Sequence, residues 1–138
     1  SLQEIAKELD VTVYAPKEEG PTEPFDLVVA DVPCSNSGVF ARRPEAKYRY
    51  DEKHITSLVE LQQTIIRDGV AVLNPNGHFL YATCSIDREE NGSQIAWMQS
   101  KRKLSLVDQF ATLPSGTPTS DPATWHDGGF AALLQRKA

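Results

Sequence analysis

The sequence predicts an α/β fold built on a largely parallel sheet. Two mostly apolar, β-branched runs, at residues 25–32 and 78–86, have the pattern of buried strands. Between them a helical stripe of apolar residues extends from 55 to 73, and a crossover helix is the usual link between parallel strands. A further helical segment and a last apolar run follow, so helices and strands alternate along the chain, as in α/β proteins.

The first 24 residues are predicted to form a helix, a strand and a loop. Apolar residues recur at helical spacing in residues 1–9, and "VTVYA" at 11–15 has the composition of a short strand. Residues 16–24, "PKEEGPTEP", form a polar loop rich in proline and glycine. The chain begins inside a helical pattern and without an initiator methionine, which indicates a piece of a longer protein.

The second half of the chain continues the alternation. "NPNG" at 74–77 is predicted to end the preceding helix in a turn. Acidic residues after the strand 78–86 favour the start of a helix that runs to the cationic "KRK" at 101–103. Residues 112–129, with their prolines and glycines, are predicted to be a loop, and "FAALLQRK" at 130–137 a closing strand.

Composition narrows the class of protein. The chain has 138 residues, of which 40% are hydrophobic and 24% charged, as expected of one globular domain. The net charge of −5 gives no overall sign of a nucleic-acid partner. Apolar runs stay short of the roughly 18 residues of a membrane helix, and two cysteines are too few for a disulfide scaffold. We therefore expect a cytoplasmic protein, and no His/Cys cluster has the spacing of a metal site.

The two cysteines occupy matching places. Cys34 follows the first predicted strand and Cys84 lies near the end of the second. Ligands bind at the carboxyl ends of strands in open α/β sheets, and a right-handed crossover can set these two strands side by side. The two thiols are then expected to face one crevice. The alternative is that each cysteine is a small buried hydrophobic residue.

Three stretches carry a resemblance to a known family: "DVPCSNSGV" at 31–39, "LQQTIIRDGVAVLNPNGHFLYATCSIDREEN" at 61–91, and "HDGGFAALLQRK" at 126–137. They resemble the catalytic part of the RNA cytosine-C5 methyltransferases, in particular the bacterial branch that modifies 16S ribosomal RNA, the Sun or Fmu type. The resemblance covers the chain from about Phe25 to its end. It implies the C-terminal half of a Rossmann-like methyltransferase fold, mostly parallel with an antiparallel closing strand.

The resemblance also implies a chemistry. Cys84 matches the nucleophile, which adds to C6 of cytosine so that C5 can attack the methyl group of S-adenosylmethionine. Asp31 matches the residue that bonds the base at N3, and Asp31 and Pro33 are expected near the cofactor. Cys34 matches the cysteine that assists elimination after methyl transfer. The target base must leave any helical stack to reach such a site.

Other residues have a functional and a structural interpretation. Asp31 at a strand end can also simply cap the following loop. The Glu90-Asn91 pair is expected at the start of a helix, and Gly38 at a loop turn. A local excess of positive charge follows the first cysteine and, in the family, borders the RNA; the alternative is a solvated surface. These four basic residues are Arg42, Arg43, Lys47 and Arg49.

The sequence departs from the family in its first 30 residues. They contain no glycine-rich cofactor loop and no acidic residue to hold the cofactor ribose, and Ala15-Pro16 stand where an aspartate is expected. Residues 1–138 are therefore expected to form one partial catalytic domain, without the cofactor-loop half and an N-terminal RNA-binding domain. By itself the chain is expected to be inactive and to bind the cofactor poorly or not at all.

Two other functions remain open at this point. The chain can be a non-catalytic α/β interaction fragment, or a thiol redox module of Cys34 and Cys84, which the lack of a C-x-x-C motif disfavours. The missing strands would also expose the edge of residues 25–32, and exposed edges pair with other strands. We expect residues 11–15 to pair there, or a homodimer to form across this edge.

Overall fold

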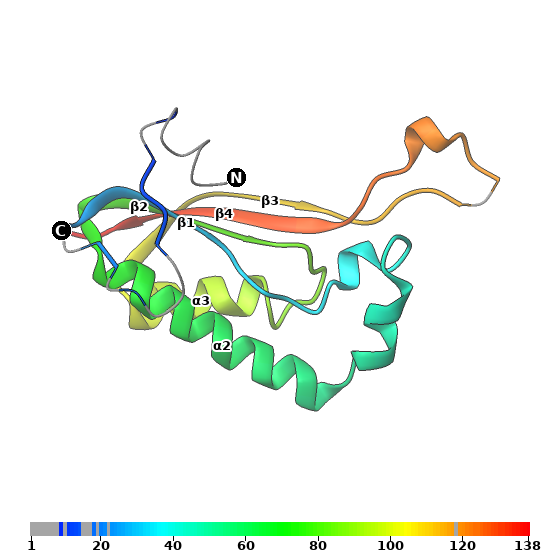
Figure 1. Ribbon diagram of the computed structural model, residues 1–138, viewed down its shortest axis with the longest axis horizontal. Coiled ribbons are helices and arrows are strands. Elements are labelled where there is room, and N and C mark those ends of the chain that lie inside the picture. The colour runs from blue at the N-terminus through cyan, green and yellow to red at the C-terminus, as the bar shows by residue number, and fades with distance from the viewer. Residues whose placement is uncertain (1–8, 10, 15–17, 19, 22, 118) are drawn as a thin grey trace.

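The computed structural model describes residues 9, 11–14, 18, 20–21, 23–117 and 119–138. The helix predicted for residues 1–9 thus lies almost entirely outside the described residues. One sheet forms the upper layer in Figure 1, and two helices pack together on one of its faces. No helix in the described ranges combines the length and the apolar character needed to cross a bilayer.

The sheet contains four strands in the order β1-β2-β4-β3. Short 3-10 helices occupy Ser37–Val39, Pro44–Arg49 and Pro122–Thr124. The strands and helices are β1 Phe25–Asp31, α2 Glu52–Ala71, β2 Leu73–Thr83, α3 Gly92–Lys101, β3 Leu104–Thr112 and β4 Gly129–Arg136.

The parallel pair β1–β2 is the part of the sheet that positions the candidate site. Helix α2 carries the chain across from one strand to the other, and Asp31 at the end of β1 lies beside Ala82 of β2. The carboxyl ends of both strands therefore meet at the same edge of the sheet. The predicted α/β class, the crossover helix and the antiparallel closing strand β4 are confirmed.

β1, β2 and β3 run in the same direction and only the closing strand β4 opposes them, so the predicted strand directions are confirmed. β3, which was not predicted, pairs antiparallel with β4, so that Leu104 lies opposite Arg136 and Thr112 opposite Gly129. Only the first residue of β3 is buried and most of the others are exposed. Because neither face of β3 is consistently buried, its sequence does not alternate between apolar and polar residues, which is the pattern by which strands are recognised.

The predicted turn at 74–77 lies inside strand β2. Helix α2 ends at Ala71 and β2 begins at Leu73. Asn76 has a φ of 64°, and the register between β1 and β2 shifts between Phe25 and Leu27. Residues 74–77 thus form a bulge in β2, where extra residues are accommodated without ending the pairing with β1.

The core lies between the sheet and the two helices. Its largest members have no exposed surface: Ile66 of α2, Phe79 and Tyr81 of β2, Met98 of α3 and Leu134 of β4. Burial of such side chains contributes about 1.5–3 kcal/mol each relative to full exposure. The core thereby holds α2 and α3 against one face of the sheet.

The outer side of β1 contradicts two expectations. β1 was expected to be buried on both faces, but Leu27 and Val29 are 53% and 59% exposed. Residues 11–14 form no strand, and in the described part of the chain β1 pairs with β2 alone. A segment this short, followed by a proline that cannot donate a hydrogen bond, gains little from pairing against the entropy of closing its loop.

Candidate functional site at the carboxyl ends of the parallel strands

The two cysteines lie together where β1 and β2 end. The Sγ atoms of Cys34 and Cys84 are 2.9 Å apart, and both thiols are free. Cys34 is buried, whereas Cys84 is partly exposed. The prediction that both thiols face one crevice is confirmed, and the two differ in their access to a ligand.

Asn36 fixes the direction of the hydrogen bonds between the thiols. Its backbone is left-handed, with a φ of 61°. The Nδ2 group donates to the Cys34 carbonyl oxygen at 3.1 Å, so Oδ1 faces Cys84 and accepts from its thiol at 2.9 Å. With the Cys84 proton directed at Asn36, the Cys34 thiol is left to donate to the Cys84 sulfur.

The pKa of Cys34 agrees with this arrangement. Burial raises the pKa of the Cys34 thiol, and the hydrogen bond with Cys84 raises it further, to about 12. Cys34 therefore stays protonated near neutral pH and remains a hydrogen-bond donor. A thiol donor at 2.9 Å would stabilise a thiolate on Cys84.

Two hollows meet at Asn36 and Cys84. The first, of about 390 Å³, is also lined by Asp31, Pro33 and Cys34. The second, of about 420 Å³, is also lined by Arg42 and Arg43; we call it the thiol hollow. The structure thus brings the predicted residues Asp31, Pro33, Cys34 and Cys84 together, with two of the four predicted basic residues.

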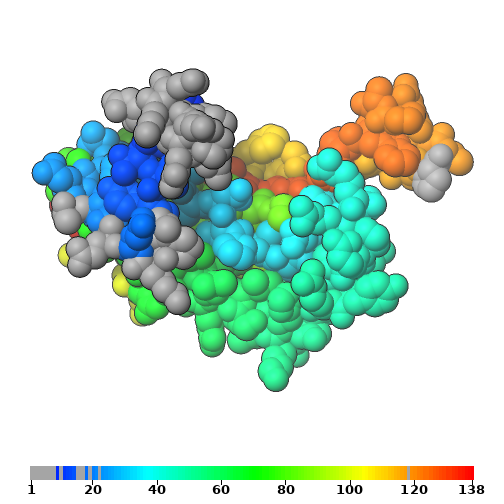
Figure 2. All heavy atoms as spheres, in the orientation of Figure 1, coloured from blue at the N-terminus to red at the C-terminus, as the bar shows by residue number. Residues whose placement is uncertain are grey.

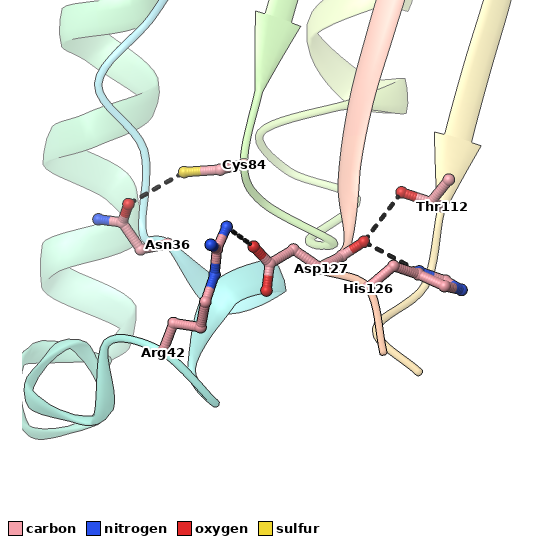
Figure 3. Close-up of polar contacts among 6 residues, drawn as sticks. All are labelled: Asn36, Arg42, Cys84, Thr112, His126 and Asp127. Carbon is pink, nitrogen blue, oxygen red and sulfur yellow. Dashed lines mark hydrogen bonds and ion pairs between the residues drawn. The ribbon is translucent and has the colours of Figure 1, made fainter. Parts of the chain in front are cut away.

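The four basic residues divide into two pairs. Arg42 forms an ion pair with Asp127 beside Cys84 (Figure 3). Lys47 and Arg49 lie on the 3-10 helix Pro44–Arg49 and are exposed; they line neither hollow. The Lys47 ammonium group lies 5.9 Å from the centre of the Phe40 ring.

Glu90 has a role beyond the one predicted. Its side chain is fully buried and accepts hydrogen bonds from the Ser35 backbone N–H at 2.9 Å, the Ser35 hydroxyl at 2.6 Å and Gln62 Nε2 at 2.9 Å. The predicted position at a helix start is confirmed, because Asn91 is the N-cap residue of α3, but the Glu90 carboxylate binds the Cys34 loop and not the helix. Because it points back from α3 to the loop, Glu90 fixes the residue directly after Cys34.

Asn91 is the N-cap residue of α3, as predicted, but its side chain holds a loop. It precedes α3 but makes no side-chain capping bond. Its Oδ1 accepts from the Thr83 hydroxyl at 2.7 Å, and its Nδ2 donates to the Ser85 carbonyl at 2.8 Å. These bonds join the residues on either side of Cys84.

Asp87 joins both cysteine loops. Its carboxylate accepts hydrogen bonds from the hydroxyls of Ser37 at 2.6 Å and Ser85 at 3.1 Å, and also from Tyr50. It also lies 3.0 Å from the Ser35 hydroxyl, which gives its proton to Glu90 at the shorter distance of 2.6 Å. Burial raises the pKa of Asp87, but these hydrogen bonds outweigh it, so the pKa is lowered. The hydrogen bond to Asp87 in turn is the main cause that raises the pKa of Tyr50 to about 12.

Sequence reasoning missed this hydroxyl and carboxylate network. The signal was a cluster of serines and acidic residues just after each strand, where polar residues are commonly taken as a solvated loop. Instead Ser35, Ser37 and Ser85 are each at most 5% exposed. Buried polar groups are costly unless they are paired, so pairing across the loops is what makes their burial possible.

Gly38 is required by close approach of the backbone. Its N–H donates to the Cys84 carbonyl at 3.0 Å, and its own carbonyl accepts from Gly128 N–H at 2.8 Å. A Cβ atom at this position would lie 2.5 Å from the Gly128 carbonyl oxygen. Gly38 thus lies in a loop turn, the 3-10 helix Ser37–Val39, as predicted. It also forms a backbone crossing that joins the two cysteine loops to the segment before β4.

The chemistry of this arrangement is nucleophilic. A partly exposed thiol, hydrogen-bonded by a neighbouring thiol, opens on two hollows that carry a carboxylate and two guanidinium groups. Such a sulfur can add to an electrophilic carbon and form a covalent intermediate. Within the described residues, no group of three His, Cys, Asp or Glu side chains could hold a metal ion.

Comparison with known proteins shows the family of the chain. The family model described as 16S rRNA methyltransferase RsmB/F matches residues 2–132. Ribosomal RNA small subunit methyltransferase B of Cronobacter sakazakii is 37% identical over 114 residues, which are 82% of this chain and 27% of that protein. The Klebsiella pneumoniae (strain 342) protein of the same name is 40% identical over 117 residues, 83% of this chain and 27% of its own length. The chain spans about a quarter of the length of these relatives.

Solved structures share the fold. The crystal structure of PH0851 matches with a TM-score of 0.69 and 28% identity, covering 98% of this chain and 34% of its own. The structure of NSun6 from Pyrococcus horikoshii with SFG matches with a TM-score of 0.70 and 22% identity, covering 99% of this chain and 38% of its own. Both likenesses confirm the predicted Rossmann-like methyltransferase fold.

Proposed function

The chain belongs to the RsmB/F family of 16S rRNA methyltransferases, and on that basis we propose that it is part of an enzyme that methylates C5 of cytosine in RNA through a covalent adduct of Cys84. One observation carries the proposal. Two free thiols with 2.9 Å between their sulfurs lie at the ends of two parallel strands, and only Cys84 is open to the hollow that carries the arginines.

Cys84 acts as the nucleophile. It loses its proton to water, and its sulfur bonds to C6 of the cytosine while the electrons of the C5–C6 double bond move toward C5. The Cys34 thiol stabilises the attacking thiolate through their hydrogen bond. A proton shared between the carboxyl group of Asp31 and N3 of the base forms their hydrogen bond, and this proton offsets the negative charge that develops on the ring as C6 is attacked.

Cys34 acts after C5 has been methylated. It gives its proton to the sulfur of Cys84 as that sulfur leaves C6, and the Cys34 thiolate that results takes the proton from C5. The C5–C6 double bond reforms, the bond between C6 and Cys84 breaks, and both cysteines end as thiols. The raised pKa of Cys34 suits this exchange, because a thiol that holds its proton at neutral pH is available as the acid.

The cofactor is S-adenosylmethionine, which supplies an activated methyl group when bound. The hollow of about 390 Å³ offers an exposed carboxylate at Asp31 and an apolar wall at Pro33. A carboxylate fits the ammonium end of this molecule, so we assign Asp31 and Pro33 to the cofactor. Because the chain lacks a glycine-rich loop, the 138 residues alone form a partial domain, inactive and with weak affinity for the cofactor.

The RNA reaches the site across the basic residues. Arg42 and Arg43 line the thiol hollow, where they can hold the phosphates that flank the target cytosine. Lys47 and Arg49 lie further along the same loop and extend the contact with the backbone. Phosphate contacts position an RNA without reading its sequence, so they agree with 16S rRNA as substrate but do not select it.

The exposed edge of β1 is a second contact surface of the chain. Leu27 and Val29 are exposed there, and an open edge pairs readily with another strand. In the isolated chain we propose a homodimer across it.

Methyl transfer tests the proposed chemistry. The whole protein that carries this chain is incubated with 16S rRNA and S-adenosylmethionine labelled in its methyl group, and the RNA is digested to nucleosides. We expect labelled 5-methylcytidine from the wild type and none from Cys84→Ala. Label in another nucleoside, or methylation that survives in Cys84→Ala, would contradict the proposal and would favour the redox or interaction alternatives.

A further inference from the structure

A second hollow adjoins the thiol hollow. The segment between β3 and β4, residues 113–128, projects from the sheet as an arm, and Figure 2 shows it standing off from the segment that follows Cys34. Between them lies a hollow of about 460 Å³. It is lined by Ala41 and Arg42 on one side and by residues 115–117 and 125–127 of the arm on the other; we call it the arm hollow.

Arg42 connects the two hollows. Its side chain lines both of them and pairs with Asp127 at the base of the arm (Figure 3). The Asp127 carbonyl accepts from the Thr112 hydroxyl at 3.3 Å, which ties the ion pair to the end of β3. A strand of RNA with one base over Cys84 therefore passes Arg42 and meets the arm hollow next.

The arm presents an aromatic surface in this hollow. The Trp125 side chain is 49% exposed. Gly116, with a φ of 111°, lies so close that a Cβ atom there would be 2.4 Å from the indole ring. Backbone hydrogen bonds of 3.0 and 3.2 Å between Ser115 and His126 hold the two sides of the arm together. The indole is thus seated against a backbone that only glycine allows.

An aromatic ring beside a guanidinium group is the chemistry that binds an unpaired base. Bases stack on aromatic side chains regardless of their identity, and arginine adds attraction to both the phosphate and the ring. We propose that the arm hollow takes an unpaired base of the RNA, stacked on Trp125, next to the nucleotide whose cytosine reaches Cys84. This inference rests on the proposed function, because it assumes that RNA enters the thiol hollow.

The affinity for RNA tests the stacking. The probe is a short, fluorescein-labelled single-stranded RNA with one central cytidine, and its binding to the whole protein is followed by fluorescence anisotropy. Trp125→Ala should weaken binding by about 5- to 150-fold, the range that corresponds to the stacking of one base. Trp125→Phe should retain most of the affinity. Gly116→Ala should weaken it, because the added Cβ displaces the indole.

The second tryptophan of the chain supplies the control. Trp97 of α3 packs against the Arg102 guanidinium group, 4.7 Å from its ring centre, and Trp97→Phe should leave RNA binding unchanged. A thermal melt followed by circular dichroism checks that each variant is folded. A probe in which one nucleotide beside the cytidine is abasic should bind the wild type more weakly than the complete probe does. Trp125→Ala should bind both probes with the same affinity, since the missing base and the missing indole remove the same contact.

The outcomes separate this inference from the proposed chemistry. The stacking proposal would be overturned, even if the Cys84 adduct forms, by either of two results. One is equal affinity of the wild type and Trp125→Ala for the complete probe. The other is that the abasic site weakens binding to Trp125→Ala as much as it weakens binding to the wild type. If Cys34→Ala binds the probe but traps no adduct when S-adenosylmethionine is present, the proposed chemistry would be overturned, while the abasic comparison still decides the stacking. A wild type that does not bind the probe would overturn both.

Discussion

The carboxyl end of the β1–β2 pair and the outer side of β1 are opposite in character. At the carboxyl end, Glu90 is buried and its oxygens are hydrogen-bonded to the loop that carries Cys34. Along the outer side, Leu27 and Val29 are more than half exposed and β1 has no second neighbour among the described strands. The hydrogen bonds that set the geometry of the thiols thus lie within this chain, whereas β1 keeps one open edge among the described strands.

The difference between these two regions shows which part of the chain is rigid. A fully paired buried network is rigid, because each member loses its partners if it moves. The network therefore holds the two sulfurs in place. The open edge of β1 and its exposed side chains have no comparable support among the described residues.

The largest effect on stability is expected at Glu90. Glu90→Ala removes the acceptor of three hydrogen bonds, and unpaired buried donors cost about 1–3 kcal/mol each when they cannot relax. We expect the free energy of unfolding to fall by about 3 kcal/mol, measured by urea denaturation.

The matched control is the exposed neighbour Glu89. Glu89→Ala should change the free energy of unfolding by no more than about 0.5 kcal/mol, as is usual on a surface. Equal effects of the two substitutions would mean that the buried network does not hold the Cys34 loop.

Asp87 is expected to have a smaller effect that depends on pH. Asp87→Asn replaces an acceptor by a donor against several hydroxyls and should cost about 1 kcal/mol near neutral pH, a low value because the carboxylate is partly exposed. Since its folded pKa is lowered from the ordinary value of 3.8, this stability is present above that value and is lost as the pH falls through the lower folded pKa.

Urea denaturation across the acidic range would show this behaviour. The difference between the wild type and Asp87→Asn should shrink as the pH falls below about 3.8. Asp68→Asn, at an exposed position of α2, is the control and should show no such trend. A constant difference between the wild type and Asp87→Asn would mean that the hydroxyls do not stabilise the Asp87 carboxylate.

The thiols are expected to differ at alkaline pH. The folded pKa of Cys34, about 12, lies above the ordinary value of 9.0. The stability that goes with the protonated thiol is therefore present below pH 9.0 and lost as the pH rises toward 12. At pH 9, iodoacetamide should modify Cys84 before Cys34, as peptide mapping by mass spectrometry would show.

Cys84→Ala would sharpen this comparison. It removes the hydrogen bond that is the second cause of the raised pKa and leaves burial in place. The alkylation of Cys34 should then begin at a lower pH than in the wild type, although still above that of a free thiol. An unchanged pH profile would mean that burial alone sets the pKa of Cys34.

The smallest effect on stability is expected at the open edge. Val29→Lys places a charge on an exposed position and should change the free energy of unfolding by no more than about 0.5 kcal/mol. It should nevertheless convert the isolated chain from dimer to monomer, because charged side chains protect sheet edges from pairing. Sedimentation measures the mass. A wild-type chain that is already a monomer would contradict the proposed homodimer.

The sequence was sufficient for features that depend on local pattern. Apolar runs and the helical stripe between them predicted β1, α2 and β2, and the order of these elements predicted that Cys34 and Cys84 would meet. Strand β3 was not predicted because most of its side chains are exposed. The contact of Glu90 with Ser35 was not predicted because the two residues are 55 positions apart in the sequence. A single sequence does not show which polar residues will be buried together.

The position of the RNA adduct tests the central claim most directly. The Cys34→Ala variant of the whole protein is incubated with 16S rRNA and S-adenosylmethionine, and the covalent complex is digested and mapped by mass spectrometry. The account predicts that the adduct accumulates, because release is impaired, and that the nucleotide is attached to Cys84. An adduct that persists in Cys84→Ala and is missing from Cys34→Ala would contradict the account, since it would make Cys34 the nucleophile.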